Sequence, residues 1–206
     1  NAVTLARRFE AVGVQMLTIH GRTREQGYKG QAEYATVAAV KQAVRIPVVV
    51  NGDITSPHTA QAALQASGAD ALMVGRAAQG RPWIFREIAH YLATGQHLAP
   101  PLVEEVRGLL LEHLDDHYRL YGSATGVRSA RKHIGWYVRD LPGGDALRRH
   151  TNTLDDCAAQ TQAVNDYFLR LGQQMERLPQ GRPATAPGAN PLTLEKTLQA
   201  VFEGAA

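Results

Sequence analysis

The sequence predicts an α/β fold, in which a parallel sheet built from βα units is followed by an all-α region. Three short apolar runs lie about 25 to 30 residues apart, with helical spacing of apolar residues between them. These runs do not alternate polar and apolar residues, which is typical of strands buried on both faces of a parallel sheet. After Leu102 no strand-like run recurs, and apolar residues fall at helical spacing.

The elements of the first part follow one another as helix and strand. Thr4 can cap a first helix, in which Leu5, Phe9 and Val12 share one face. Strands are predicted at 16–19, 47–50 and 71–74, and helices at 34–44, at 56–66 and after Pro82. The helix at 56–66 has the strongest start signal, because a serine cap is followed by proline in the first turn.

The spacing of these units is that of a (β/α)8 TIM barrel, and a doubly wound sheet is the other arrangement they could form. Three units cannot close a barrel, so we expect residues 1–98 to be the C-terminal part of one. We expect residues 99–178 to form a helical domain. Residues 179–206 are rich in Pro, Ala and Gly and are expected to be a tail, with a short helix near 194–202.

Bulk composition narrows the class of protein. The chain has 206 residues and a net charge of +3. It has no run of the roughly 18 apolar residues that a membrane helix needs, so no membrane partner is expected. Its single cysteine, Cys157, excludes an intrachain disulfide framework and favours a cytoplasmic location.

Positive charge is concentrated between residues 119 and 149. Seven basic and two acidic residues there give +5, which leaves −2 for the rest of the chain. If residues 127–140 form one helix, four cations share a narrow stripe with Gly135, which would let another backbone approach: Arg128, Arg131, Lys132 and Arg139. Val127, Ala130, Ile134 and Val138 form the buried side. This pattern predicts a site for the phosphates of RNA, and a solvated helix face is the alternative.

Polar and glycine residues follow the predicted strands, where βα barrels carry their functional sites. They are His20 after the first strand, Asn51, Gly52 and Asp53 after the second, and Gly75 and Arg76 after the third. Glycine allows close approach to backbone N–H groups and arginine binds phosphate, so the last two loops predict a phosphate site. A simple turn is the alternative. His20 is either a satisfied polar residue or a donor to the carbonyl of a ring cofactor.

The helical part also contains two histidines and two aromatic residues whose types suit other roles. His113 and His117 have the i, i+4 spacing of metal ligands, but no third ligand stands out, and we expect no metal site. Trp136 and Tyr137 could stack on bases, although burial in the core is the favoured interpretation.

The order and spacing of several motifs resemble those of the tRNA-dihydrouridine synthases, over residues 3–175. Residues 131–137 look like the bacterial B-type subfamily. The motifs are His20-Gly-Arg-Thr-Arg24, then Gln26, Tyr28, Gly30 and Tyr34, then Ile46-Pro-Val48, Asn51-Gly-Asp-Ile54, Met73-Val-Gly-Arg-Ala77, Gly80-Arg-Pro-Trp83 and Arg131-Lys-His-Ile-Gly-Trp-Tyr137.

The resemblance implies an FMN-bearing barrel and a helical tRNA-binding domain, with NADPH as the reductant of the flavin. It implies that Asn51, Gly52 and Asp53 lie at the FMN phosphate and ribityl chain. It also implies that Gly75 and Arg76 bind the phosphate, that His20 lies beside the flavin ring, and that Arg22 and Arg24 face the nucleic acid. The expected catalytic cysteine lies upstream of Asn1, so no catalytic residue is expected in this chain, and the full-length enzyme is expected to be monomeric.

Two other functions stay open from the sequence. One is a different FMN-dependent TIM-barrel oxidoreductase that acts on a small molecule, which the basic stripe disfavours. The other is a non-catalytic RNA-binding module, which the expected position of the cysteine outside this chain favours.

Overall fold

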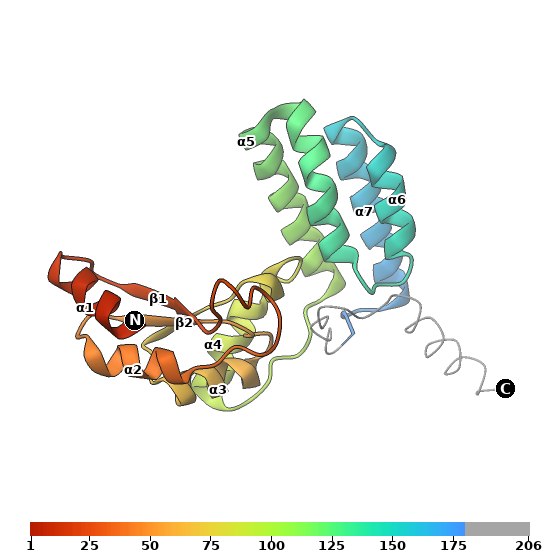
Figure 1. Cartoon of the computed structure of the whole chain (residues 1–206). Coiled ribbons are helices and arrows are strands. Elements are labelled where there is room, and N and C mark those ends of the chain that lie inside the picture. The colour runs from red at the N-terminus through yellow and green to blue at the C-terminus, as the bar shows by residue number, and fades with distance from the viewer. Residues whose placement is uncertain (180–206) are drawn as a thin grey trace.

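The computed structural model describes residues 1–179, and it is a mixed α/β structure with a small parallel sheet and many helices (Figure 1). The tail expected at 179–206, with its helix, lies outside the described residues from 180 onward. The first part contains α1 (Ala2–Ala11), β1 (Leu17–His20), α2 (Ala35–Ala43), β2 (Val48–Asn51), α3 (Pro57–Ser67), β3 (Ala71–Met73), the 3-10 helix η1 (Arg76–Ala78) and α4 (Ile84–Thr94). The second part contains α5 (Val103–Val138), α6 (Gly144–Thr153) and α7 (Cys157–Gln174).

The three predicted strands form one sheet in the order β1-β2-β3, and both pairs are parallel. Val48, Val49 and Val50 of the central strand are buried, as the apolar run predicts. The prediction of burial on both faces is wrong for β1 and β3, where for example Met73 is 47% exposed. These strands are the edges of the described sheet, so each lacks a neighbour on one side.

Local sequence explains the helix ends. The predicted cap of α3 is confirmed, because the Ser56 side chain accepts a hydrogen bond from the Thr59 N–H while Thr59 Oγ1 accepts one from the Ser56 N–H. Pro57 occupies the first turn, and Gly68 ends the helix in the left-handed conformation. The helix predicted over α1 is confirmed, but its N-cap is Asn1 rather than Thr4, and the face that carries Leu5 and Phe9 is exposed.

The segment labelled α5 consists of two helices, because Gly122 has φ 70 and ψ 171 and breaks the helical backbone. Residues 103–121 and 123–138 therefore run side by side in opposite directions, with α6 and α7 packed beside them (Figure 1). The predicted buried side of the second half is confirmed, since Val127, Ala130, Ile134 and Val138 are at most 1% exposed.

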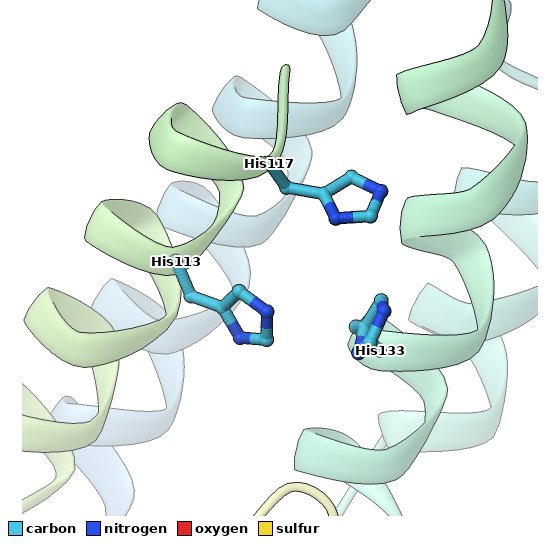
Figure 2. Close-up of side chains that lie close together, drawn as sticks. All are labelled: His113, His117 and His133. Atoms are coloured by element: carbon cyan, nitrogen blue, oxygen red, sulfur yellow. The ribbon is translucent and has the colours of Figure 1, made fainter. Parts of the chain in front are cut away.

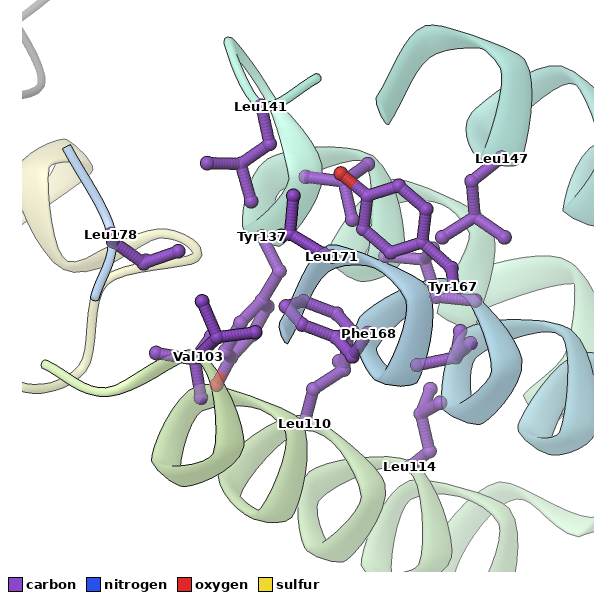
Figure 3. Packing of buried hydrophobic residues seen from close by; sticks show 14 of the residues in the cluster. Val103, Leu110, Leu114, Tyr137, Leu141, Leu147, Tyr167, Phe168, Leu171 and Leu178 are labelled. Carbon is purple, nitrogen blue, oxygen red and sulfur yellow. The ribbon is translucent and has the colours of Figure 1, made fainter. Parts of the chain in front are cut away.

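Two clusters of buried hydrophobic residues form the interior. One joins the sheet to α1–α4, and the other joins α5, α6 and α7 around Leu110, Phe168 and Leu171 (Figure 3). Trp83 precedes α4 but belongs to the second cluster, where its ring lies 6.3 Å from that of Tyr137. The second cluster thus includes a residue from before the predicted boundary at 98/99, and that boundary stays a prediction.

The described helices were compared with the length and apolar character that a membrane-spanning helix needs. Within residues 1–179, none is both long and apolar enough to cross a membrane.

Candidate functional site

Strand register brings the predicted strand-end residues together. His20 is opposite Asn51, and Asn51 is opposite Met73, so the loops that follow β1, β2 and β3 leave the same edge of the sheet. The Asn51 side chain donates a hydrogen bond to the Met73 carbonyl at 2.8 Å, and the Gly21 N–H donates to the Asn51 carbonyl at 2.8 Å. Asn51 therefore joins all three strand ends.

Asp53 is the hub of the loops beyond this edge. Its Oδ2 accepts hydrogen bonds from Arg22 Nη2 at 2.6 Å and from the Ala32 N–H at 2.8 Å, and its Oδ1 lies 3.6 Å from Arg76 Nη2. Burial acts to raise the pKa of Asp53, but the hydrogen bonds from Arg22 and Ala32 and the charges of Arg22 and Arg76 lower it below its ordinary value. The carboxylate is therefore ionised at neutral pH.

Gly52 allows the tight turn before Asp53. Its φ is +127, and an added Cβ would lie 2.8 Å from the Ala32 Cβ, so only glycine fits without movement. The Gly52 carbonyl accepts a hydrogen bond from the Tyr34 hydroxyl at 2.8 Å. Burial raises the pKa of Tyr34, so this hydroxyl keeps the proton that it donates.

Arg22 points inward, toward Asp53, rather than toward solvent. Its side chain is 3% exposed, and it also donates to the carbonyls of Lys29 and Gly30 at 3.2 and 2.7 Å. Its Nη1 is buried and has no partner among residues 1–179. Arg22 thus holds the loop after β1 closed over Asp53, whereas Arg24, also expected to face nucleic acid, is exposed in that loop.

Arg76 is an exposed cation at this edge. Its side chain is 48% exposed, and its guanidinium lies over the Tyr28 ring at 4.5 Å. Beside it, an added Cβ at Gly75 would meet no atom within 4 Å, so the backbone there is open. The backbone at Gly75 is open, and Arg76 lies 3.6 Å from Asp53, which is longer than a hydrogen bond. Together they can accept an anion such as a phosphate.

His20 is exposed at the same edge and has a defined tautomer. Its Nδ1 lies 3.0 Å from the backbone N–H of Arg22, which can only donate. Nδ1 therefore accepts, and in the neutral ring Nε2 carries the proton. The free donor of His20 is Nε2–H.

The basic residues of α5 differ in their surroundings. Arg128 and Lys132 are exposed, with Lys132 Nζ 5.8 Å from the Trp136 ring centre. Arg131 instead donates to the Leu154 carbonyl at 3.0 Å and to Asp155 at 2.9 Å, and its side chain is 27% exposed.

The far end of the predicted stripe lies just beyond the helix. Arg139 is exposed, but it follows the last helical residue, Val138. Gly135 was expected to admit an approaching backbone. The space beside it is filled instead by Arg148 of α6, whose Cδ would lie 3.2 Å from an added Cβ. The contacts of Gly135 with Arg148 and of Arg131 with Asp155 could not be predicted from the sequence, because they depend on how α6 and α7 pack against α5.

The aromatic pair after Gly135 divides between the interior and the surface. Tyr137 is 3% exposed, which confirms its predicted place in the core, and burial raises its pKa to about 12. Trp136 is half-buried and lies beside Lys132.

Comparison with known proteins gives a consistent result. The family model described as dihydrouridine synthase (Dus) matches residues 1–172. The tRNA-dihydrouridine synthase B of Pseudomonas putida is 52% identical over 176 residues, which cover 85% of this chain and 52% of that protein. That of Pseudomonas aeruginosa is 54% identical over 168 residues, 82% of this chain and 51% of the relative. That of Pectobacterium carotovorum is 53% identical over 171 residues, 83% of this chain and 53% of the relative. The chain spans about half the length of these curated relatives.

Proposed function

The chain belongs to the dihydrouridine synthase family, and from this premise we propose that it forms part of an FMN-dependent oxidoreductase that reduces uridines in tRNA to dihydrouridine. The observation that carries the proposal is the family match over residues 1–172. We further propose that the parallel sheet is part of a (β/α)8 barrel, that NADPH is the reductant and that the enzyme works in the cytoplasm. Reduced FMN, when bound, would supply a hydride to one carbon of the uracil C5–C6 double bond, and a general acid of the full-length enzyme would supply the proton to the other carbon.

The strand ends support binding of the FMN phosphate. Arg76 is an exposed cation there, and the open backbone at Gly75 allows close approach of phosphate oxygens. Asp53 keeps Arg76 near this position, while Arg22 and the Gly52 turn fix Asp53. His20 would offer its Nε2–H to a carbonyl of the flavin ring, and Asn51 would lie along the ribityl chain.

The second half of α5 supports binding of tRNA. Arg128 and Lys132 on the helix, and Arg139 just after it, are exposed cations, an arrangement suited to backbone phosphates. Arg131 would act there with the part of its guanidinium not used by Leu154 and Asp155. A separate grip on the tRNA body lets an enzyme hold its substrate while the target base is turned out of the stack.

The test uses the full translation product of the gene that encodes this chain. We expect bound flavin and NADPH-dependent formation of dihydrouridine in unmodified tRNA. Bound flavin without product would favour the oxidoreductase that acts on a small molecule. Binding of tRNA without flavin would favour the non-catalytic RNA-binding module.

Two variants test the phosphate site. Arg76→Gln is expected to weaken FMN binding about tenfold or more, because it removes a charge-assisted hydrogen bond. Arg45→Gln is the matched control, since Arg45 is exposed in the loop before β2, at the opposite end of that strand, and should leave FMN affinity unchanged. Equal affinities of the two variants would contradict the site.

Charge reversal tests the RNA surface. The double variant Arg128→Glu and Lys132→Glu is expected to weaken tRNA binding. Because it removes about two phosphate contacts, the slope of log affinity against log salt concentration should become shallower by about two. Arg8→Glu, on the exposed side of α1, should change neither. Unchanged tRNA affinity of the double variant would contradict this surface as the tRNA site.

A further inference from the structure

Three histidines meet between the two halves of α5. His113 and His117 lie one turn apart on residues 103–121, and His133 lies on residues 123–138. The reversal at Gly122 places His133 opposite the pair, so that one ligand atom from each ring lies within 4.8 Å of the others. Figure 2 shows the three rings gathered in the space between these helices. The sequence alone identifies only the i, i+4 pair, because the third member depends on the reversal.

The ring of His117 is oriented by Ser129. The Ser129 hydroxyl donates its one proton to the Thr125 carbonyl at 2.8 Å, so it must accept from His117 Nε2, which lies 2.7 Å away. This leaves the lone pair of Nδ1 free, and Figure 2 shows that the second nitrogen of His117 faces the other two histidines. A hydrogen bond that fixes the outer nitrogen is what orients most metal-binding histidines in proteins.

The three rings are in a form that suits metal binding. His117 is 8% exposed, and His113 and His133 are half-buried. Burial lowers the pKa of each ring, and the pKa of His133 falls to about 4. The rings are therefore neutral at neutral pH, and neutral imidazole is the form that coordinates a metal ion.

We propose that His113, His117 and His133 bind one divalent transition-metal ion such as Zn²⁺, with a fourth position left to water. Imidazole nitrogens suit Zn²⁺, Cu²⁺ and Ni²⁺ better than Mg²⁺ or Ca²⁺. With Zn–N bonds of about 2.0–2.1 Å, tetrahedral ligand nitrogens lie roughly 3.3–3.4 Å apart, so side-chain rotation has to close at most about 1.5 Å.

The ion would connect the two halves of α5 across the break at Gly122. Within residues 103–138 these halves meet through side-chain packing and through the hydrogen bond between His117 and Ser129. Metal binding would thereby stabilise the half that carries Arg128 and Lys132. The proposal does not depend on the proposed tRNA chemistry.

Binding of metal ions alone tests the proposal. The full chain, without a histidine tag and stripped of metal by a chelator, is titrated with Zn²⁺ and with Co²⁺. We expect one ion per chain, the visible absorption of tetrahedral Co²⁺, and a melting temperature that rises with Zn²⁺ concentration. Ser129→Ala should weaken binding by roughly 10- to 100-fold, and His133→Gln should weaken it further.

The matched control is His150→Gln, because His150 is an exposed histidine on α6, outside the cluster. It should bind Zn²⁺ as the wild type does. Wild-type affinity no greater than that of His133→Gln, or an equal loss in His150→Gln, would overturn the proposal. X-ray absorption of the Zn²⁺-loaded wild type decides the matter if a variant fails to fold, since three imidazoles are expected around the ion and an all-oxygen shell would overturn the site.

Discussion

At the scale of single residues, the strand-end loops depend on one carboxylate. Asp53 has φ 49, a conformation that aspartate tolerates better than most residues, and it is the partner of an arginine whose side chain is 3% exposed. A buried guanidinium without its carboxylate would lose its charge-assisted hydrogen bond and keep its desolvation cost. Asp53 is therefore required for the loop after β1 to stay closed.

Replacement of Asp53 by asparagine is expected to lower the free energy of unfolding by roughly 1.5–3 kcal/mol at pH 7, the range for a hydrogen bond to a charged group. Urea unfolding of the two proteins measures the difference. Asp155→Asn is the control, because that carboxylate is 89% exposed and pairs with Arg131 at the surface. A loss no larger than in the control would contradict the role of Asp53.

The same carboxylate predicts a pH dependence. Because folding lowers the pKa of Asp53 from its ordinary value of 3.8, its contribution is present above that value and is lost as pH falls through the folded pKa. The difference between wild type and Asp53→Asn should therefore shrink between about pH 5 and pH 2. A difference that stays constant over this range would show that shape rather than charge accounts for it.

The sequence predicts which residues stand at the strand ends but not which of them pair. Gly52, Asp53 and Arg76 are found at the ends of consecutive parallel strands, where the register of β1, β2 and β3 brings them together. The pairing of Asp53 with Arg22, 31 positions earlier, depends on the path of an irregular loop. No periodicity constrains such a loop, so an inward Arg22 could not be distinguished from an outward one.

At the scale of elements, one buried amide joins three helices. Gln160 of α7 is 0% exposed, and its amide donates to the carbonyls of Thr151 at 2.9 Å and Val127 at 3.3 Å. Its oxygen accepts a hydrogen bond from the Tyr118 hydroxyl at 2.8 Å. Burial raises the pKa of Tyr118 to about 12, so that hydroxyl stays protonated.

Gln160→Leu should therefore lower the free energy of unfolding by about 1–3 kcal/mol or more, because it leaves buried polar groups without partners. Gln162→Leu, two residues along α7, is the matched control, since Gln162 is exposed. Its effect should stay within roughly 0.5 kcal/mol. Guanidinium unfolding of both variants measures the contrast, and similar losses would show that the amide network contributes little.

The limits of sequence-based prediction at this scale are visible in α5. Apolar periodicity predicts helix from 102 onward, and the buried side at Val127, Ala130, Ile134 and Val138 is as expected. The break at Gly122 is not predicted, because a glycine within a helical pattern is compatible with an uninterrupted helix. Without the break, His133 would lie far along one helix from His113.

At the scale of the whole molecule, the α/β part contacts the helices at a glycine. Gly80 lies in the loop between η1 and α4, with φ 68, and an added Cβ would overlap the backbone of Trp136 and lie 2.6 Å from the Tyr137 nitrogen. Arg86 of α4 also pairs with Glu105 of α5 at 2.7 Å. The α/β part and the helices thus touch backbone to backbone.

Gly80→Ala is expected to separate the unfolding of the two parts. The left-handed backbone costs alanine about 1–2 kcal/mol, and the overlap with α5 adds roughly 1–3 kcal/mol. Gly95→Ala isolates the first cost, because Gly95 has φ 72 and open space around an added Cβ. Calorimetry should show two transitions, or one broadened transition, only for Gly80→Ala. Identical profiles would mean that α5 moves aside at little cost.

The contact at Gly80 also bears on the distance between the basic residues of α5 and the strand ends. Backbone atoms in contact resist compression, so the contact at Gly80 limits how closely α5, with Lys132, can approach the strand ends, with Arg76. A nucleic acid held on α5 would present to the strand ends whichever nucleotide lies at that distance, whatever its neighbours are. Target choice would then depend on distance along a folded RNA, and Gly80→Ala should spread dihydrouridine to adjacent uridines in sequenced product.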